Sequence, residues 1–209
     1  MRIVITDDHP IVRRGLRGHL LEHLPNAEIV ETGNAGEAIE ALGSGTWDLA
    51  IVDINLPGRS GLDLIEDIKR LWPRLPVLVV SAHHEEDYAL RAFKLGASGY
   101  VSKLSAADVL VAAVKKVLSG GRYVSQAVAE RLAMAAAGDW SGAPHETLSH
   151  RELQVLQMIA RGRTIKEIAA DLALSDKTIA TYRSRISAKL ALHSNVDLTR
   201  YALRHGLVD

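Results

Sequence analysis

The sequence predicts an α/β fold followed by an all-α fold within a chain of 209 residues. First, short apolar runs alternate five times with amphipathic segments over residues 2–118. Second, three of these runs are rich in Ile and Val with little polar alternation, which is typical of strands covered on both faces. Third, the strand signal disappears at Leu148, and only helical periods remain beyond it.

Five βα units in succession predict a parallel sheet with right-handed crossovers, and a five-stranded sheet of this kind is commonly flavodoxin-like. Pro10 suits the first turn of a helix. The predicted strands are Arg2–Thr6, Ala27–Glu31, Leu49–Asp53, Pro76–Ser81 and Gly99–Ser102. The predicted helices are Pro10–His23, Ala35–Leu42, Gly61–Leu71, Glu85–Leu95 and Ser105–Leu118.

The pattern changes at Gly120-Gly121. Ser125–Ala137 is Ala-rich and predicted to be helical, whereas residues 138–147 are turn-rich and indicate an interdomain linker. Four further helices are predicted over Ser149–Arg161, Ile165–Leu172, Asp176–Leu190 and Asn195–His205. The expected organisation is a first domain over residues 1–121, a linker with a helix over 122–146, and a four-helix domain over 147–209.

The composition excludes several classes of site. The chain has no cysteine, so disulfides, thiolate zinc fingers, iron–sulfur clusters and a cysteine nucleophile are excluded. No apolar run approaches the ~20 residues of a membrane span, and the N-terminal run ends too early for a secretory signal, so we expect a cytoplasmic protein. The 25 Lys and Arg residues balance 25 Asp and Glu residues, and this zero net charge argues against nucleic acid as a partner.

Polar residues gather where the predicted strands end, at the sheet edge where ligands bind in such folds. Asp7 and Asp8 follow the first strand, Asp53 ends the third, Ser81 ends the fourth and Lys103 follows the fifth. Three crowded carboxylates repel one another, and Mg²⁺ with its oxygen ligands would relieve that repulsion. The metal and the lysine could then neutralise a phosphoryl group while a carboxylate acts as the nucleophile.

Each of these residues alone has an ordinary structural interpretation. An Asp at a strand end is more often a turn or helix cap, and Ser81 could cap the following helix. Lys103 could be a solvated surface lysine, and Tyr100 an ordinary aromatic of a strand. Their combined placement at one edge favours the functional interpretation.

The motifs around these residues resemble the receiver domain of bacterial two-component response regulators over residues 1–125. They are Asp7-Asp8-His9-Pro10, Asp53-Ile54-Asn55-Leu56-Pro57-Gly58, Val79-Val80-Ser81-Ala82 and Gly96-Ala97-Ser98-Gly99-Tyr100-Val101-Ser102-Lys103. The resemblance implies that Asp53 is the phosphoacceptor. It implies a Mg²⁺ site formed by Asp8, Asp53 and the backbone carbonyl of Asn55, with Asp7 contributing through water.

The same resemblance implies the roles of three further residues. Lys103 would pair with the phosphoryl group, Ser81 would hydrogen-bond it, and Tyr100 would turn inward when the group is present. Leu104 departs from the family pattern, in which proline often follows the lysine, so a cis-proline bond is not available there.

The C-terminal helices predict a helix-turn-helix. Ser149 and Glu152 fit a capping box, and Ile179, Ile186 and Leu190 recur at helical spacing in the third helix. The other side of that helix carries small polar and basic residues that can approach base edges or grip phosphates, although a solvated basic face is the alternative. The candidate DNA-binding residues are Lys177, Thr178, Ala180, Thr181, Arg183, Ser184, Arg185 and Lys189.

Residues 147–207 resemble the DNA-binding domain of the NarL/FixJ (LuxR-type) regulators. The motifs are Leu148-Ser149-His150-Arg151-Glu152, Ile165-Lys166-Glu167-Ile168-Ala169 and Leu174-Ser175-Asp176-Lys177-Thr178-Ile179. In that family the third helix enters the major groove and the fourth forms dimers, so the resemblance implies a homodimer on double-stranded DNA. The candidate dimer contacts are Val196, Leu198 and Tyr201. Tyr182 stands where the family often has histidine, so base preference does not carry over.

These features together favour a response regulator that is not an enzyme: a transcription factor whose DNA binding is controlled when a cognate histidine kinase phosphorylates Asp53. An enzyme is the second hypothesis, because an aspartyl nucleophile with Mg²⁺ also serves phosphatases. Phosphatases usually need an acid/base carboxylate two residues after the nucleophile, where this chain has Asn55. A third hypothesis, an adaptor controlled by a partner without phosphorylation, is disfavoured by the complete acidic set.

The zero net charge is a cancellation between regions. Residues 1–125 contain 14 bases and 16 acids, a net of −2, and residues 126–147 contain 1 base and 3 acids, again −2. Residues 148–209 contain 10 bases and 6 acids, a net of +4. This modest positive charge predicts weak binding of one copy to DNA through charge alone, which favours a dimer as the binding form.

Overall fold

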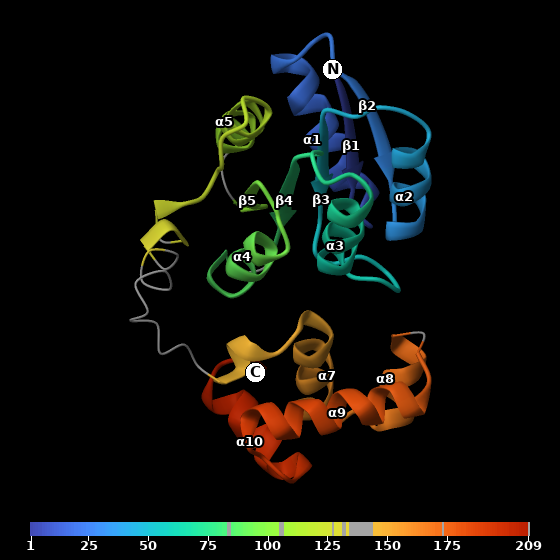
Figure 1. The fold of residues 1–209 in the computed structure, drawn as a ribbon, viewed down its shortest axis with the longest axis vertical. Coiled ribbons are helices and arrows are strands. Elements are labelled where there is room, and N and C mark those ends of the chain that lie inside the picture. The colour runs from blue at the N-terminus through green and yellow to red at the C-terminus, as the bar shows by residue number, and fades with distance from the viewer. Residues whose placement is uncertain are drawn as a thin grey trace. The chain divides into compact units, whose positions relative to one another are not determined.

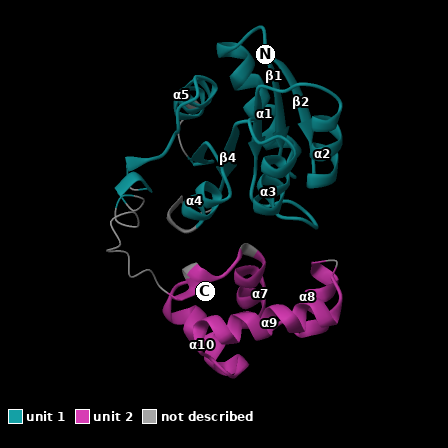
Figure 2. Ribbon diagram, in the orientation of Figure 1, with its two compact units in different colours: residues 1–140 teal, residues 141–209 magenta. Residues whose placement is uncertain are grey.

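The computed structural model describes residues 1–82, 85–104, 107–126, 128–130, 133, 144–172 and 174–208. The chain divides into two compact units, unit 1 over residues 1–140 and unit 2 over residues 141–209 (Figure 2). In the described part of the chain, no helix is both long and apolar enough to cross a membrane.

Unit 1 contains a five-stranded parallel sheet in the order β2-β1-β3-β4-β5 (Figure 1). This confirms the predicted α/β fold. Every residue of β3 and β4 is buried, which explains why these strands read as continuous apolar runs. The strands are β1 Arg2–Thr6, β2 Glu28–Thr32, β3 Leu49–Val52, β4 Val77–Ser81 and β5 Gly99–Ser102.

Helices cover both faces of the sheet. Helices α1 and α5 pack together over one face, where Leu20 and Val114 join a core with Ile5 and Leu78. Over the other face, α3 packs against both α2 and α4. The helices are α1 Pro10–His23, α2 Ala35–Gly43, α3 Gly61–Leu71, α4 Glu85–Lys94 and α5 Ala107–Leu118.

The predicted element bounds in unit 1 agree with the structure to within two residues. Asp53 was predicted as the last residue of a strand but lies just beyond β3, although its N–H still donates to the carbonyl of Thr6 at 2.8 Å. Side-chain caps begin two of the helices: Asn34 caps α2, and Ser60 and Asp63 form a capping box at α3. Residues 105–106, predicted as the start of α5, and most of the predicted helix 125–137 lie outside the described residues.

Unit 2 consists of helices, as the sequence predicts. Ser149, Thr164, Ser175 and Ser194 each accept a backbone hydrogen bond at the start of a helix. The elements are the 3-10 helix η1 Pro144–Thr147 and the helices α7 His150–Ala160, α8 Ile165–Asp171, α9 Asp176–Leu190 and α10 Asn195–Arg204.

The η1 segment is a difference from the sequence prediction, which assigned residues 138–147 to a turn-rich linker. Pro144 supplies a φ angle suited to a first helical turn, and the hydroxyl of Thr147 donates to the carbonyl of Pro144 at 2.7 Å. These local bonds form a single tight turn, which leaves no periodic signal in a sequence.

Candidate functional site

The carboxyl edge of the sheet in unit 1 brings two buried carboxylates to one lysine. Asp7 follows β1, Asp53 follows β3, and these two strands are neighbours. The ammonium of Lys103, which follows β5, lies 2.6 Å from Asp7 Oδ2 and 2.7 Å from Asp53 Oδ2. Because the two carboxylates share one cation, the buried cluster carries a surplus negative charge when all three groups are ionised.

The pKa of Asp53 reflects this environment. Burial raises the pKa of the Asp53 carboxyl above its ordinary value, since an apolar surrounding disfavours the charged form. Lys103 and the backbone N–H of Asn55 oppose that effect, whereas the negative charge of Asp7 adds to it. For Lys103, burial lowers the pKa, but its hydrogen bonds with Asp53 and Asp7 outweigh burial and the net shift is upward.

The residues present fit a divalent cation with oxygen ligands. Asp7, Asp8, His9 and Asp53 each offer a ligand atom, and these atoms lie within 4.8 Å of one another. Asp53 Oδ1 is buried and has no hydrogen-bond partner among the described residues. A buried anionic oxygen without a donor is costly, and a hard cation would compensate it. Asn55 is exposed two residues beyond Asp53, on the loop that leads to α3.

Sequence reasoning assigned no role to His9. Its Nδ1 lies 2.6 Å from Asp8 Oδ1, and its backbone N–H donates to Asp7 Oδ1 at 2.8 Å. The backbone contact orients one carboxylate of the cluster. Position beside two acidic residues is the signal that could have identified it.

Ser81 and Tyr100 lie in the interior at the ends of β4 and β5. Ser81 is fully buried, and its carbonyl accepts a hydrogen bond of 2.8 Å from the N–H of Lys103. The side chain of Tyr100 is 1% exposed, so it already occupies the inward position that the sequence analysis expected only after phosphorylation. Leu104 is 88% exposed, and no cis peptide bond occurs among the described residues.

Two further residues shape the edge of the sheet without a predicted role. A Cβ atom on Gly61 would lie 1.9 Å from the carbonyl oxygen of Asp53, so only glycine lets α3 begin this close to the phosphoacceptor candidate. Arg13 in α1 donates a hydrogen bond to the carbonyl of Asp7. The sequence shows these residues but gives no distance between segments that are remote in the chain.

In unit 2, α9 presents one apolar and one polar side, as predicted. Ile179, Ile186 and Leu190 are buried in the unit's core. The exposed residues of the candidate set are Lys177, Ala180, Thr181, Ser184, Arg185 and Lys189.

Three of the candidates on α9, including the exposed Lys189, also contact neighbouring segments of the unit. Thr178 lies at the start of the helix, where its N–H donates to the hydroxyl of Ser175. The Arg183 guanidinium donates to Asn195 Oδ1 at 2.7 Å. The ammonium of Lys189 donates to Glu152 Oε2 at 2.6 Å and to the carbonyl of Thr147 at 3.1 Å, so it ties α9 to α7 and η1.

The candidate dimer contacts on α10 do not form one exposed patch. Val196 is 65% exposed, but Leu198 is fully buried in the core of unit 2. The structure therefore does not support a surface contact for Leu198, because the same apolar side that suggested a dimer contact packs inside the unit. The hydroxyl of Tyr201 accepts a hydrogen bond from the N–H of His145 at 3.2 Å.

Known proteins resemble both units and their order along the chain. Residues 3–115 match the family described as response regulator receiver domain, and residues 146–202 match the bacterial regulatory proteins of the luxR family. The chain is 34% identical to the response regulator UvrY of Escherichia coli K12, an alignment that covers 99% of this chain and 95% of that one. It is 33% identical to the response regulator GacA of Pseudomonas aeruginosa, with coverage of 100% and 98%.

Solved structures give the same result. The regulator RcsB from Salmonella enterica serovar Typhimurium, bound to promoter rprA with the phosphomimetic BeF3⁻, matches with a TM-score of 0.68 and 29% identity over 96% of this chain and 97% of that chain. A LuxR-family response regulator from Aurantimonas sp. SI85-9A1 matches with a TM-score of 0.59 and 37% identity, over 65% of this chain and 97% of that chain.

Proposed function

The chain belongs to the two-component response regulators with a LuxR-type DNA-binding domain, and we propose that Asp53 is the residue whose phosphorylation controls its binding to DNA. The observation that carries this proposal is the position of the Asp53 carboxylate. It is buried beside Lys103, shares that lysine with Asp7, and has one oxygen without a hydrogen-bond partner among the described residues.

The proposed reaction is transfer of a phosphoryl group from a phosphohistidine of a cognate histidine kinase, or from a small acyl phosphate. A bond forms between phosphorus and a carboxylate oxygen of Asp53, and the bond from phosphorus to the donor atom breaks with its electron pair left on the donor. Lys103 lies 2.7 Å from Asp53, so its ammonium can pair with the phosphoryl oxygens.

Asp7, Asp8, Asp53 and the backbone carbonyl of Asn55 are the proposed Mg²⁺ ligands. When bound, Mg²⁺ supplies positive charge that offsets the carboxylates and the phosphoryl oxygens. Two observations support this fit. One oxygen from each of the three carboxylates lies within 4.8 Å of the others, and Asp53 Oδ1 has no hydrogen-bond partner among the described residues.

The phosphoryl group adds about −1.5 to −2 charge and three strong acceptor oxygens, and Ser81 is the proposed hydroxyl donor to one of them. Because Tyr100 is already buried, we do not propose that phosphorylation creates the inward position. We propose instead that phosphorylation favours the inward position of the Tyr100 ring over an outward one, which is a shift between two populations. The surface formed by α4, β5 and α5 then differs between the two populations.

The proposed output is binding of double-stranded DNA by α9, as a homodimer on paired half-sites. Five of the six exposed candidates are the proposed contacts: Lys177, Ala180, Thr181, Ser184 and Arg185. We propose a smaller contribution to DNA contact from Lys189 and Arg183. The ammonium of Lys189 already binds Glu152, and the guanidinium of Arg183 already binds Asn195. The dimer contact proposed for α10 rests on Val196 and on Leu203, which are both more than half exposed.

Labelling of the full chain with a radioactive acyl phosphate and Mg²⁺ tests the assignment of Asp53. The D53N variant is expected to lose labelling completely, since an amide is not a nucleophile here. The matched control D108N alters an exposed carboxylate of α5 and is expected to label like the unmodified chain. Stoichiometric labelling of D53N would show that another residue is the phosphoacceptor.

A further inference from the structure

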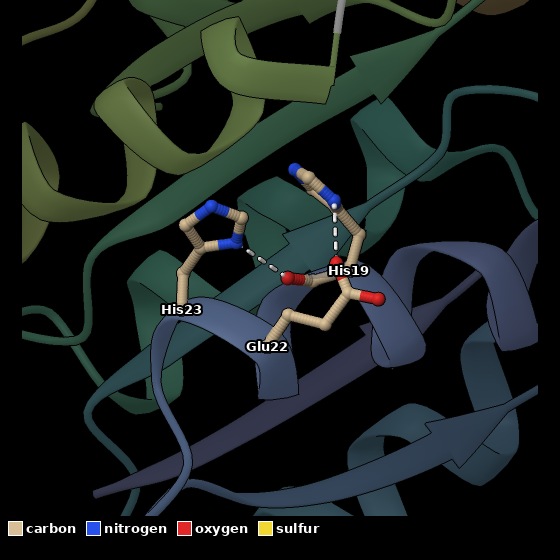
Figure 3. Close-up of side chains that lie close together, drawn as sticks. All are labelled: His19, Glu22 and His23. Atoms are coloured by element: carbon tan, nitrogen blue, oxygen red, sulfur yellow. Dashed lines mark hydrogen bonds and ion pairs between the residues drawn. The ribbon is translucent and has the colours of Figure 1, made fainter.

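The last turn of α1 gathers two imidazoles and a carboxylate on one side of the helix (Figure 3). Glu22 follows His19 by three residues and His23 follows it by four, the two spacings at which helical side chains are neighbours. His19 Nδ1 lies 3.5 Å from Glu22 Oε2, and the two imidazole ring centroids are 4.7 Å apart. One nitrogen or oxygen from each residue lies within 4.8 Å of the others.

The orientation of the two imidazoles decides which nitrogens a cation would meet. His19 Nδ1 is the ring nitrogen beside Glu22, whereas His19 Nε2 is buried and has no hydrogen-bond partner among the described residues. His23 Nδ1 lies 3.1 Å from the carbonyl of His19 and donates to it, so a cation that binds this atom must displace its proton. Metal binding to histidine releases such protons, and the bound cation would then replace this local hydrogen bond.

We propose that His19, Glu22 and His23 form a binding site for a divalent transition metal of the zinc class. Imidazole nitrogen with one carboxylate suits Zn²⁺, Cu²⁺ or Ni²⁺, whereas Mg²⁺ prefers oxygen ligands only. Three protein ligands leave the remaining coordination positions to water. The partial negative charge at the C-terminal end of α1 also favours a cation there.

This site is separate from the acidic cluster around Asp53. Helix α1 begins at Pro10, directly after the acidic residues Asp7 and Asp8, and ends at His23. The fourteen residues of α1 span about 21 Å, so the two sites lie toward opposite ends of the helix. A metal bound at the far end joins three side chains of one helical turn and stabilises unit 1 by mass action, since the unfolded chain does not hold the three groups together.

Zinc titration of the full chain against a chromophoric chelator tests the proposal, in an excess of Mg²⁺ that occupies the acidic cluster. The unmodified chain is expected to bind one equivalent of Zn²⁺ at this site. H19Q and H23Q are each expected to weaken this binding by at least about tenfold, since loss of even an outer-shell partner costs that much. The control H193Q alters an exposed histidine of unit 2 and is expected to bind zinc normally.

Absorption spectroscopy of the Co²⁺ form identifies the ligands directly. In the Co²⁺ form, the visible absorption expected of imidazole ligation should disappear in H19Q and H23Q and persist in H193Q and H9Q. Circular dichroism of each variant checks that α1 and the rest of the chain remain folded. Equal zinc affinity in all variants, loss only in H9Q, or no stoichiometric zinc binding by the unmodified chain would each overturn the proposal.

Discussion

Lys103 in unit 1 and Lys189 in unit 2 each contact a buried carboxylate, yet the two contacts differ in charge balance. Lys103 lies 2.6–2.7 Å from two carboxylates, Asp7 and Asp53, and its side chain is 15% exposed. Lys189 pairs with the single carboxylate of Glu152 at 2.6 Å, and its side chain is 39% exposed. The first cluster keeps a surplus negative charge and an unpartnered oxygen, whereas the second is balanced.

The difference shows how one kind of pair serves either chemistry or stability. A balanced pair with satisfied hydrogen bonds links two helices and offers nothing to a ligand. A cluster in which carboxylates outnumber cations stays ready for a metal ion and a phosphoryl group. The sequence analysis assigned phosphate binding to both lysines, because residue type and helix position do not reveal the partner of a side chain.

The substitution with the largest expected effect on stability is G61A, which tests whether the surplus-charge cluster depends on close backbone packing. The new Cβ would lie 1.9 Å from the carbonyl oxygen of Asp53, so α3 must shift. We expect a loss of about 3 kcal/mol in the free energy of unfolding of unit 1, the upper range for overpacking. Denaturant unfolding, monitored by amide hydrogen exchange in each unit, measures this change in the free energy of unfolding.

The control for this substitution is G162A in unit 2, where φ is +81° but nothing lies within 4 Å of the added Cβ. Its expected cost is about 1 kcal/mol, from backbone strain alone. A G61A protein as stable as the unmodified chain would mean that the loop after Asp53 adapts freely, and the cluster would not need its present geometry.

The E152Q substitution tests the balanced pair through pH. Burial alone would raise the pKa of Glu152, but the hydrogen bonds from Lys189 and Ser149 outweigh it, and the pKa lies below its ordinary value of 4.5. The stabilisation from Glu152 is therefore complete above pH 4.5 and is lost as the pH falls through the lower pKa of the folded state. E152Q is expected to remove this part of the acid sensitivity of unit 2.

At neutral pH, E152Q is expected to destabilise unit 2 by about 1 kcal/mol, the lower end of the range for a lost partner, because the partly exposed Lys189 can be solvated by water. D53N is the counterpart in unit 1. It removes a surplus buried charge, so it is expected to leave the stability of unit 1 unchanged or to raise it. Equal losses in both variants would contradict the distinction between a balanced pair and a surplus-charge cluster.

The smallest expected effect concerns the exposed basic residues of α9, whose charged groups act on DNA rather than inside unit 2. K177A is expected to reduce the slope of log affinity against log salt by about 0.9, the value for one lost phosphate contact. The control K115A alters an exposed lysine of α5 and should leave the slope unchanged. Fluorescence anisotropy of labelled DNA over a salt series measures both slopes.

Topology explains why much of the acidic cluster could be predicted. Asp7, Asp53, Ser81 and Lys103 each stand at or just past the end of a strand, and parallel strands bring those ends to one edge whatever the details of packing. The apolar runs identify the strands, so the cluster follows from positions in the chain. The interior place of Tyr100 depends on side-chain rotation, which the sequence does not encode in any period.

The contacts that escaped prediction join distant segments through single side chains. Glu152 and Lys189 are 37 residues apart, and His145 and Tyr201 are 56 apart. No hydrophobic period marks such pairs. Leu198 shows a related limit, because an apolar residue on a terminal helix can serve the unit's own core or a partner, and only its burial distinguishes the two.

Selection of genomic DNA fragments by the full chain, with and without acyl phosphate and Mg²⁺, tests the central claim most directly. The unmodified chain is expected to enrich a set of fragments more strongly after phosphorylation, while D53N should show the same low enrichment in both conditions. Equal enrichment by the unmodified chain with and without acyl phosphate, or a phosphate-dependent gain that persists in D53N, would contradict control of DNA binding through Asp53.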